Sequence, residues 1–182
     1  MRCFIAIPLP REIKDYLVML QNDFLNDSAL GLGMTPVKDF HLTLKFLGDV
    51  EDSKIKLIAD SLRKVRFNKL QISLNDFGVF PSESYVRVMW IGLNPEKDII
   101  GLQRRIEESL KGFGFSDEKD FKAHITIARV KSVADKKKLN EKIKSIKIEK
   151  KSFAMEDFRL VKSTLTPQGP VYEDLEVFHN KI

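Results

Sequence analysis

Apolar residues recur every three or four positions in four stretches of this chain, which is the spacing of one buried helix face. The predicted helices cover residues 11–25, 50–65, 95–110 and 132–146. Their apolar stripes are Ile13, Tyr16, Leu17, Leu20 and Phe24; Ile55, Ile58, Ala59, Leu62 and Val65; Ile99, Leu102, Ile106 and Leu110; and Leu139, Ile143 and Ile146. Polar residues fill the opposite faces, so the helices should cover the outside of a common core.

Between these helices, β-branched and apolar residues alternate or form short runs, as is typical of strands. The predicted strands are residues 2–7, 40–47, 70–74, 85–93, 124–129, 153–164 and 172–178. Residues 26–38 and 77–84 contain glycine and proline, so we expect loops there. Mixed helices and strands of this length predict an α+β fold.

One strand pattern occurs twice, as His41-Leu-Thr-Leu and as His124-Ile-Thr-Ile. Because side chains alternate across a strand, each histidine shares a face with the threonine two residues later. The leucines or isoleucines occupy the other face and are expected to be buried. A single pattern of this kind is a weak signal, but two at matching positions favour a functional pair.

The two histidines are 83 residues apart, and the same shift superposes other predicted elements. It carries residues 3–7 onto 86–90 and the helix at 52–65 onto 135–148. We therefore predict one bilobal domain, residues 1–182, built from pseudo-symmetric βαβ-type halves at about 1–84 and 85–182. Its antiparallel sheets should meet at a central cleft with the helices outside, and terminal strands are expected to be exchanged between the lobes.

Composition agrees with a folded protein that binds an anion. The chain has 182 residues, of which 43% are hydrophobic, and a formal net charge of +5, which makes RNA a plausible partner. No apolar run approaches the about 18 residues of a membrane span. The single cysteine, Cys3, lies in an apolar strand and is expected to be a buried reduced thiol. We expect a cytoplasmic monomer.

Two imidazoles suggest metal-free acid–base chemistry. With ordinary pKa values of about 6.5, one histidine can accept a proton while the other donates one. In-line displacement at phosphorus needs both events. Neither motif offers the further histidine or cysteine that a zinc site requires, so we expect no metal and no cofactor. The third histidine, His179, lacks the pattern and is expected to be structural or exposed.

Candidate phosphate ligands follow from the same strands. The hydroxyl groups of Thr43 and Thr126 could hold non-bridging oxygens, and Arg129 could offset negative charge in the transition state. Arg129 lies five residues from His124, so it reaches the same face only if the strand ends or bulges there. Lys45 lies four residues after His41, so in a regular strand the two side chains share one face. Lys45 is therefore a second candidate cation.

These motifs resemble those of the two-histidine phosphoesterases, specifically the LigT-like RNA 2',3'-cyclic phosphodiesterases, also called 2'-5' RNA ligases. The resemblance covers nearly the whole chain. It is carried by both His-x-Thr-x motifs, Arg2-Cys-Phe-Ile-Ala-Ile, Phe46-Leu-Gly, Val88-Met-Trp-Ile-Gly, Ala123-His-Ile-Thr-Ile-Ala-Arg and Ser163-Thr-Leu-Thr-Pro-Gln-Gly-Pro-Val-Tyr.

The resemblance implies hydrolysis of a terminal RNA 2',3'-cyclic phosphate to a 2'-phosphomonoester. It also implies that His41 is the proton donor, that His124 is the proton acceptor, and that nucleotides bind in the cleft; the residues alone leave the two roles open. Attack by a 5'-hydroxyl would give ATP-independent 2'-5' ligation, and tRNA fragments are candidate substrates.

Two alternatives remain at this stage. The chain could be a non-catalytic RNA-binding protein in which Phe80, Tyr85 or Phe121 stacks on bases. It could also apply the same chemistry to small cyclic nucleotides or to 2'-5' oligoadenylates.

Overall fold

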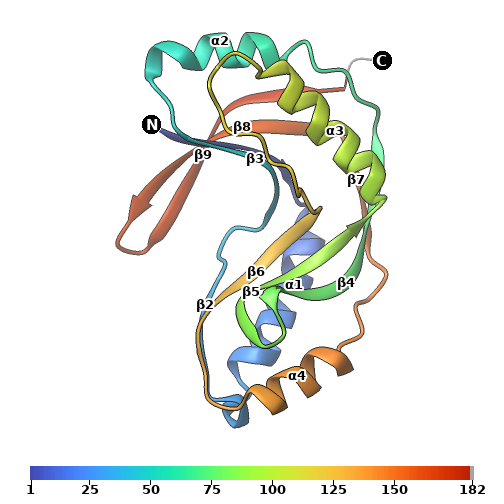
Figure 1. Cartoon of the computed structure of the whole chain (residues 1–182). Helices are drawn as coiled ribbons and strands as arrows, with labels where there is room; N and C mark the ends of the chain where they lie inside the picture. Colours follow the sequence, from blue (N-terminus) through green and yellow to red (C-terminus); the bar gives the residue numbers. More distant parts are fainter. Residues whose placement is uncertain (181–182) are drawn as a thin grey trace.

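The computed structural model describes residues 1–180 and shows an α+β fold with two antiparallel sheets (Figure 1). The first sheet has the order β3-β1-β8-β9. Its strands are β3 (His41–Asp49), β1 (Arg2–Pro8), β8 (Asp157–Thr166) and β9 (Gly169–His179). The first sheet therefore joins strands from both ends of the chain.

The second sheet has the order β2-β6-β5-β4-β7. Its strands are β2 (Leu32–Pro36), β6 (His124–Val133), β5 (Tyr85–Asn94), β4 (Leu70–Ser82) and β7 (Ser152–Met155). Strands β2 and β4 come from the first half of the chain and β6 from the second. The two motif strands, β3 and β6, contact each other where the sheets meet.

Each motif strand is packed by a helix from the other half of the chain (Figure 1). Helix α1 (Arg11–Leu25) follows β1 but contacts β2 and β6 of the second sheet. Helix α3 (Glu96–Ser109) follows β5 but contacts β3 of the first sheet and packs beside α2 (Asp52–Leu62). Helix α4 (Lys136–Ser145) contacts the short 3-10 helix η1 (Ser28–Leu30). No helix in residues 1–180 has the length and apolarity needed to cross a membrane.

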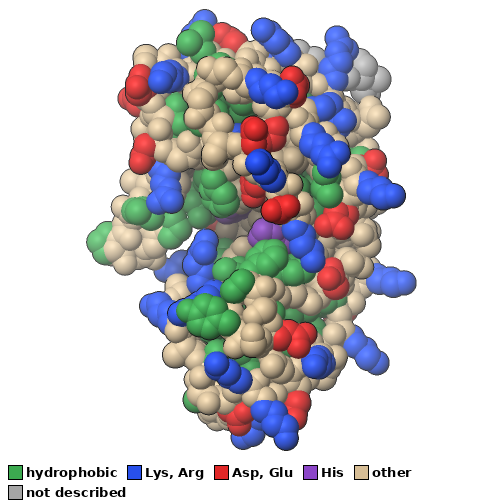
Figure 2. Space-filling model, viewed as in Figure 1, with side chains coloured by type: hydrophobic (Ala, Val, Ile, Leu, Met, Phe, Trp, Pro, Cys, Tyr) green, Lys and Arg blue, Asp and Glu red, His purple; other side chains and the backbone are tan. Residues whose placement is uncertain are grey.

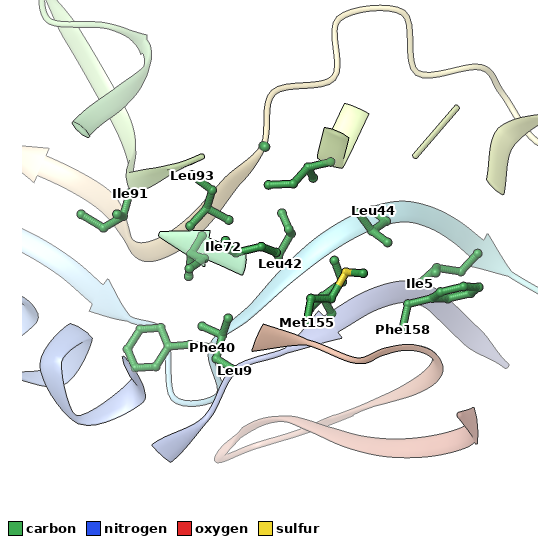
Figure 3. Close-up of a cluster of buried hydrophobic side chains, with 14 of the residues drawn as sticks. Ile5, Leu9, Phe40, Leu42, Leu44, Ile72, Ile91, Leu93, Met155 and Phe158 are labelled. Carbon is green, nitrogen blue, oxygen red and sulfur yellow. The ribbon is translucent and has the colours of Figure 1, made fainter. Parts of the chain in front are cut away.

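One hydrophobic core joins the two sheets (Figure 3). Ile5, Leu42, Leu44 and Phe158 enter it from the first sheet, and Ile72, Ile91, Leu93 and Met155 enter it from the second. All eight side chains are almost fully buried. Since burial of such side chains is the main driving force for folding, the two halves stabilise each other and hold the motif strands in place.

Several predicted boundaries differ from the structure. Residues 32–36 form β2, and β4 continues to Ser82, through most of the stretch 77–84 that we predicted as a loop. Gly78 pairs with Trp90, whose indole ring occupies the space that a side chain at position 78 would need. The glycine in this strand therefore reflects close packing rather than a turn. Helix α4 begins at Lys136 because β6 extends to Val133.

Candidate active site

The two motif strands carry the same irregularity at the same place. In β3, Ala6 pairs with Thr43 and Ile5 pairs with Lys45, so Leu44 is an extra residue. In β6, Trp90 pairs with Thr126 and Met89 pairs with Ala128, so Ile127 is extra. These β-bulges confirm the duplication. They also show that β1 corresponds to β5 with a shift of 84 residues, one more than the motif spacing predicts.

The bulges change which residues of the two motif strands are exposed. Before each bulge the predicted alternation holds, with both histidines and both threonines partly exposed and the intervening leucines or isoleucines buried. After each bulge the parity is reversed. In β3 the residue that becomes exposed is Phe46, and in β6 it is Arg129. Arg129 was expected to share a face with His124 only if the strand ended or bulged between them, and the bulge at Ile127 meets that condition.

Arg129 also acts electrostatically on the other sheet. The pKa of Tyr172 in β9 is raised by burial and by Asp39, and Arg129 and Arg2 oppose this rise. The ring of Tyr172 contacts His41, with the ring centroids 5.2 Å apart. The Arg129 cation of the second sheet is thus close enough to influence Tyr172, the residue that contacts His41 on the first sheet.

Gln21 in α1 holds the bulge of β6, a role that we did not predict. Its side-chain amide is buried and donates to the carbonyl oxygens of Ile127 at 2.5 Å and Val37 at 2.8 Å. Val37 N donates to the same Ile127 oxygen at 3.0 Å. A buried amide with satisfied hydrogen bonds fixes the local backbone, and here it fixes the residue whose insertion turns Arg129 outward. The available signal was a glutamine on the apolar stripe of the helix, four residues after Leu17.

The structure contradicts Lys45 as a phosphate ligand. The bulge turns its side chain away from His41 and into the interior, where it is only 2% exposed. Lys45 Nζ donates to both carboxylate oxygens of Glu107 and to the carbonyl oxygen of Ser116, each at 2.8 Å. Lys45 therefore ties the first motif strand to α3 and to the segment that leads into the second motif.

The two histidines are held by equivalent hydrogen bonds. His41 Nδ1 donates to the carbonyl oxygen of Asp39 at 3.1 Å, and His124 Nδ1 donates to that of Lys122 at 2.8 Å. A carbonyl oxygen can only accept, so each Nδ1 carries the proton and Nε2 is the nitrogen that can exchange one. Each imidazole is thus fixed in one tautomer, as a general acid or base requires.

Aromatic rings surround both histidines. Phe4 stacks on His41 with centroids 4.8 Å apart, while Phe80 and Trp90 meet His124 edge-on at 5.1 and 6.0 Å. This packing removes water, and the resulting desolvation lowers the pKa of both His41 and His124.

The charges next to the two histidines differ in sign. Desolvation has the largest effect on the His41 pKa. The Asp39 carboxylate has the second largest effect, and it raises that pKa. His124 has Lys122 at the matching position, and this ammonium group lowers the His124 pKa further. Of the neighbouring charges, the Asp39 carboxylate therefore favours the protonated form of His41, and the Lys122 ammonium group favours the neutral form of His124.

Figure 2 shows histidine side chains in a hollow between the upper and lower parts of the molecule, with basic and hydrophobic side chains nearby. Within residues 1–180, no group of three or more histidine, cysteine, aspartate or glutamate side chains is arranged to hold a metal ion. Two residues lie outside this arrangement. Cys3 is buried, as predicted, and His179 is exposed at the end of β9.

Comparison with known proteins gives consistent matches. A family model described as LigT like Phosphoesterase matches residues 7–90 and again 91–172. The chain is 36% identical over 174 residues to the RNA 2',3'-cyclic phosphodiesterase of Methanocaldococcus jannaschii, with 95% of this chain and 97% of the relative covered. It is 38% identical over 180 residues to the protein of the same name from Thermotoga maritima, with 96% and 93% covered.

The fold also matches solved structures. Apo LigT of E. coli superposes with a TM-score of 0.77 at 26% identity, covering 100% of this chain and 98% of that one. A complex of E. coli LigT with 3'-AMP gives a TM-score of 0.73 at 24% identity, with the same coverage. Because the family model matches both halves and the sequence relatives extend over nearly the whole length, this chain belongs to the LigT-like phosphoesterase family.

Proposed function

We propose that this protein is a metal-independent RNA 2',3'-cyclic phosphodiesterase that converts a terminal cyclic phosphate into a 2'-phosphomonoester. The observation that carries the proposal is the pair of equivalent histidines, each with its Nδ1 proton held by a backbone carbonyl. The names of its relatives from Methanocaldococcus jannaschii and Thermotoga maritima support the same reaction.

In this mechanism His124 is the base and His41 is the acid. His124 Nε2 takes a proton from water as the water oxygen bonds to phosphorus. The bond from phosphorus to the 3'-oxygen breaks, and His41 Nε2 gives its proton to that oxygen. Asp39 beside His41 and Lys122 beside His124 support this assignment, because they favour the protonated and neutral forms respectively.

Thr43, Thr126 and Arg129 would bind the phosphate. Each threonine lies two residues after its histidine and on the same face of the strand. The hydroxyl groups would donate to non-bridging oxygens, and the Arg129 guanidinium group would offset the charge that grows on them. The β-bulge that brings Arg129 to this face supports its role, whereas Lys45 has no part in it.

The same site could run a related transfer. If a 5'-hydroxyl replaces water, its oxygen bonds to phosphorus and the 3'-oxygen leaves in the same way, which gives a 2'-5' linkage without ATP. Hydrolysis should dominate because water is far more concentrated than RNA ends. The ligation, the use of tRNA fragments, a monomeric state and a cytoplasmic location stay predictions.

Turnover of an oligoribonucleotide that ends in a 2',3'-cyclic phosphate tests the proposal. We expect the protein to form a 2'-phosphate in EDTA, with His41→Ala and His124→Ala each losing about 10²–10⁴-fold in rate. His179→Ala is the matched control and should keep full activity. RNA binding without turnover would instead favour a non-catalytic RNA-binding protein.

Substrate size separates the remaining alternative. E. coli LigT has been crystallised with 3'-AMP, which supports nucleotide binding in this cleft as well. If small cyclic nucleotides or 2'-5' oligoadenylates were the substrates, long RNA with a cyclic phosphate end would compete poorly against them. We expect the RNA end to compete effectively.

A further inference from the structure

A pocket of about 250 Å³ lies at the far end of β5 and β6, beside α4 (Figure 1). Its aromatic and basic lining residues are Tyr85, Arg87, Lys131 and Lys136. The strand partner of His124 is Gly92, and Tyr85 lies seven residues before Gly92 on β5. At about 3.3 Å per residue, this separation is about 20 Å. The pocket is therefore too far from His124 to hold the nucleotide whose phosphate reacts.

Two further β-bulges place basic residues at this end of the sheet. Arg87 is an extra residue where β5 pairs with β4, and Lys131 is an extra residue where β6 pairs with β2. Bulges occur next to active sites, where they redirect side chains. Both extra residues line the pocket, so the bulges contribute directly to its shape and charge.

Tyr85 lies on the face of the sheet that carries His124. The ring of Phe80 in β4 contacts His124, and Ser82 follows Phe80 by two residues in the same strand, so their side chains share one face. Ser82 pairs with Tyr85 where β4 turns into β5. The Tyr85 side chain is 52% exposed, so a ligand that extends from His124 along this face can reach its ring.

Arg87 is fixed by contacts with its neighbours. Its guanidinium group lies over the Tyr85 ring, 4.5 Å from the centroid. Nη1 donates to the carbonyl oxygen of Lys131 at 3.0 Å, and Nη2 donates to the Tyr85 hydroxyl group. A guanidinium group has five N–H donors, so Arg87 keeps donors for a ligand. An arginine that is stacked and held in this way is preorganised to bind phosphate.

The positive charges around the pocket lack carboxylate partners. Within residues 1–180, Arg87, Lys131 and Lys136 form no ion pair, and all three side chains are exposed. Glu83 also lines the pocket, but its carboxylate pairs with Lys144 at 3.5 Å. Cations that lie together without partners repel one another, so an anion bound between them would be stabilised. Charge complementarity therefore favours a polyanion at this place.

We infer that this pocket binds the RNA chain upstream of the reacting end, with backbone phosphates on its cations and a base against Tyr85. Basic surfaces with an aromatic platform bind single strands in this way. Arg129 is exposed on β6 between His124 and Lys131, so a further cation lies along the path. A chain that touches both places spans about 20 Å and needs several nucleotides. The inference rests on the proposed function, because it takes RNA as the substrate.

Chain length tests the inference. A dinucleotide and a decanucleotide with the same terminal 2',3'-cyclic phosphate would be compared as substrates. We expect the intact protein to favour the decanucleotide by about tenfold or more in kcat/KM, through a lower KM. The double variant Lys131→Gln/Lys136→Gln should reduce this advantage about tenfold and leave kcat/KM for the dinucleotide within twofold.

The matched control is Lys97→Gln/Arg104→Gln, which removes the same charge from exposed positions on α3. This variant should keep the advantage of the decanucleotide. Equal loss in the two double variants would show that only the net charge matters and would overturn the inference. Equal kcat/KM for both substrates in the intact protein would also overturn it, and the proposed function would still stand.

A binding measurement keeps the inference testable if no cyclic phosphate is hydrolysed, a result that would refute the proposed function itself. The probe is a fluorescent decanucleotide with a 3'-hydroxyl end, followed by anisotropy at several salt concentrations. Each lost phosphate contact lowers the slope of log affinity against log salt by about 0.7, so Lys131→Gln/Lys136→Gln should lower it by about 1.4. Arg87→Gln should weaken binding about tenfold.

Competition distinguishes RNA from an acidic protein as the occupant. Unlabelled decanucleotide should displace the probe, whereas polyglutamate at the same concentration of charge should not, because it offers neither bases nor phosphates. Displacement by polyglutamate as effective as that by RNA would contradict the inference. Unchanged affinity and salt slope in both Arg87→Gln and Lys131→Gln/Lys136→Gln would contradict it as well.

Discussion

Replacing Lys45 with methionine should destabilise the protein strongly, because the largely buried Glu107 carboxylate would lose its cation. Lys45 is 2% exposed and Glu107 is 16% exposed, so solvent can replace little of the lost interaction. Removing one partner of a buried ion pair typically costs about 3–5 kcal/mol. That is a large part of the about 5–15 kcal/mol that stabilises an ordinary domain.

A double-mutant cycle separates the pair from the packing around it. Glu107→Leu alone should also cost about 3–5 kcal/mol, because the ammonium group would keep only the Ser116 carbonyl. The double substitution should cost about 1–3 kcal/mol, chiefly because the buried Gln103 amide loses the Glu107 carboxylate as acceptor. The loss in the double variant is therefore smaller than the sum of the single losses.

Urea unfolding followed by circular dichroism measures these differences. The control is Lys69→Met, because Lys69 and Glu156 form a pair at 2.9 Å in which both side chains are more than half exposed. Such pairs contribute at most about 1 kcal/mol. Additive losses in the double variant, or a Lys45→Met variant as stable as the Lys69→Met control, would refute the description of Lys45 as a buried ion-pair residue.

Four further outcomes are expected. Arg129→Met should lower kcat about 10²–10³-fold without changing the thermal midpoint, and an unchanged rate would remove Arg129 from the site. Gln21→Leu should lower kcat/KM because the bulge loses its buried amide, and the backbone amide shift of Arg129 reports that change by NMR. Lys122→Gln should move the acidic limb of the kcat/KM profile upward, because the pKa of His124 is no longer depressed by that cation; an unmoved limb would contradict its influence. Burial keeps the folded-state pKa values of His41 and His124 below the ordinary value of about 6.5, so the unfolded chain binds more protons below that pH. The free energy of unfolding should therefore fall as the pH drops from 7 to 5. It should fall less in a variant with asparagine at both positions.

Local periodicity was sufficient to predict the helices and the pairing of motifs. The stripe of α1 is buried as expected, because an amphipathic helix on a core must bury its apolar face. The duplication was visible because two strands repeat the same short pattern at matching places. Both features depend on residues close together in the sequence, so they can be read without knowing which segments pair.

The features that depend on pairing between distant segments were not predictable in this way. A bulge is set by the hydrogen bonds between neighbouring strands, which a local sequence pattern does not reveal. Regular alternation therefore predicted the wrong face for Lys45, and it could predict the face of Arg129 only on the condition of a bulge. A glycine such as Gly78 is typical of a turn in sequence, whereas in the structure it makes room for the Trp90 ring of the paired strand. The hydrogen bond from Gln21 to Ile127 joins residues 106 positions apart, beyond the reach of any local pattern.

The pH dependence of kcat/KM in the protein and its two single-histidine variants tests paired acid–base catalysis most directly. The intact protein should give a bell with its maximum below about pH 6.5, because burial lowers both histidine pKa values. In the residual activity, His124→Ala should lose the acidic limb and His41→Ala should lose the basic limb. A bell-shaped profile that survives in either variant would contradict the assignment of that histidine as acid or base.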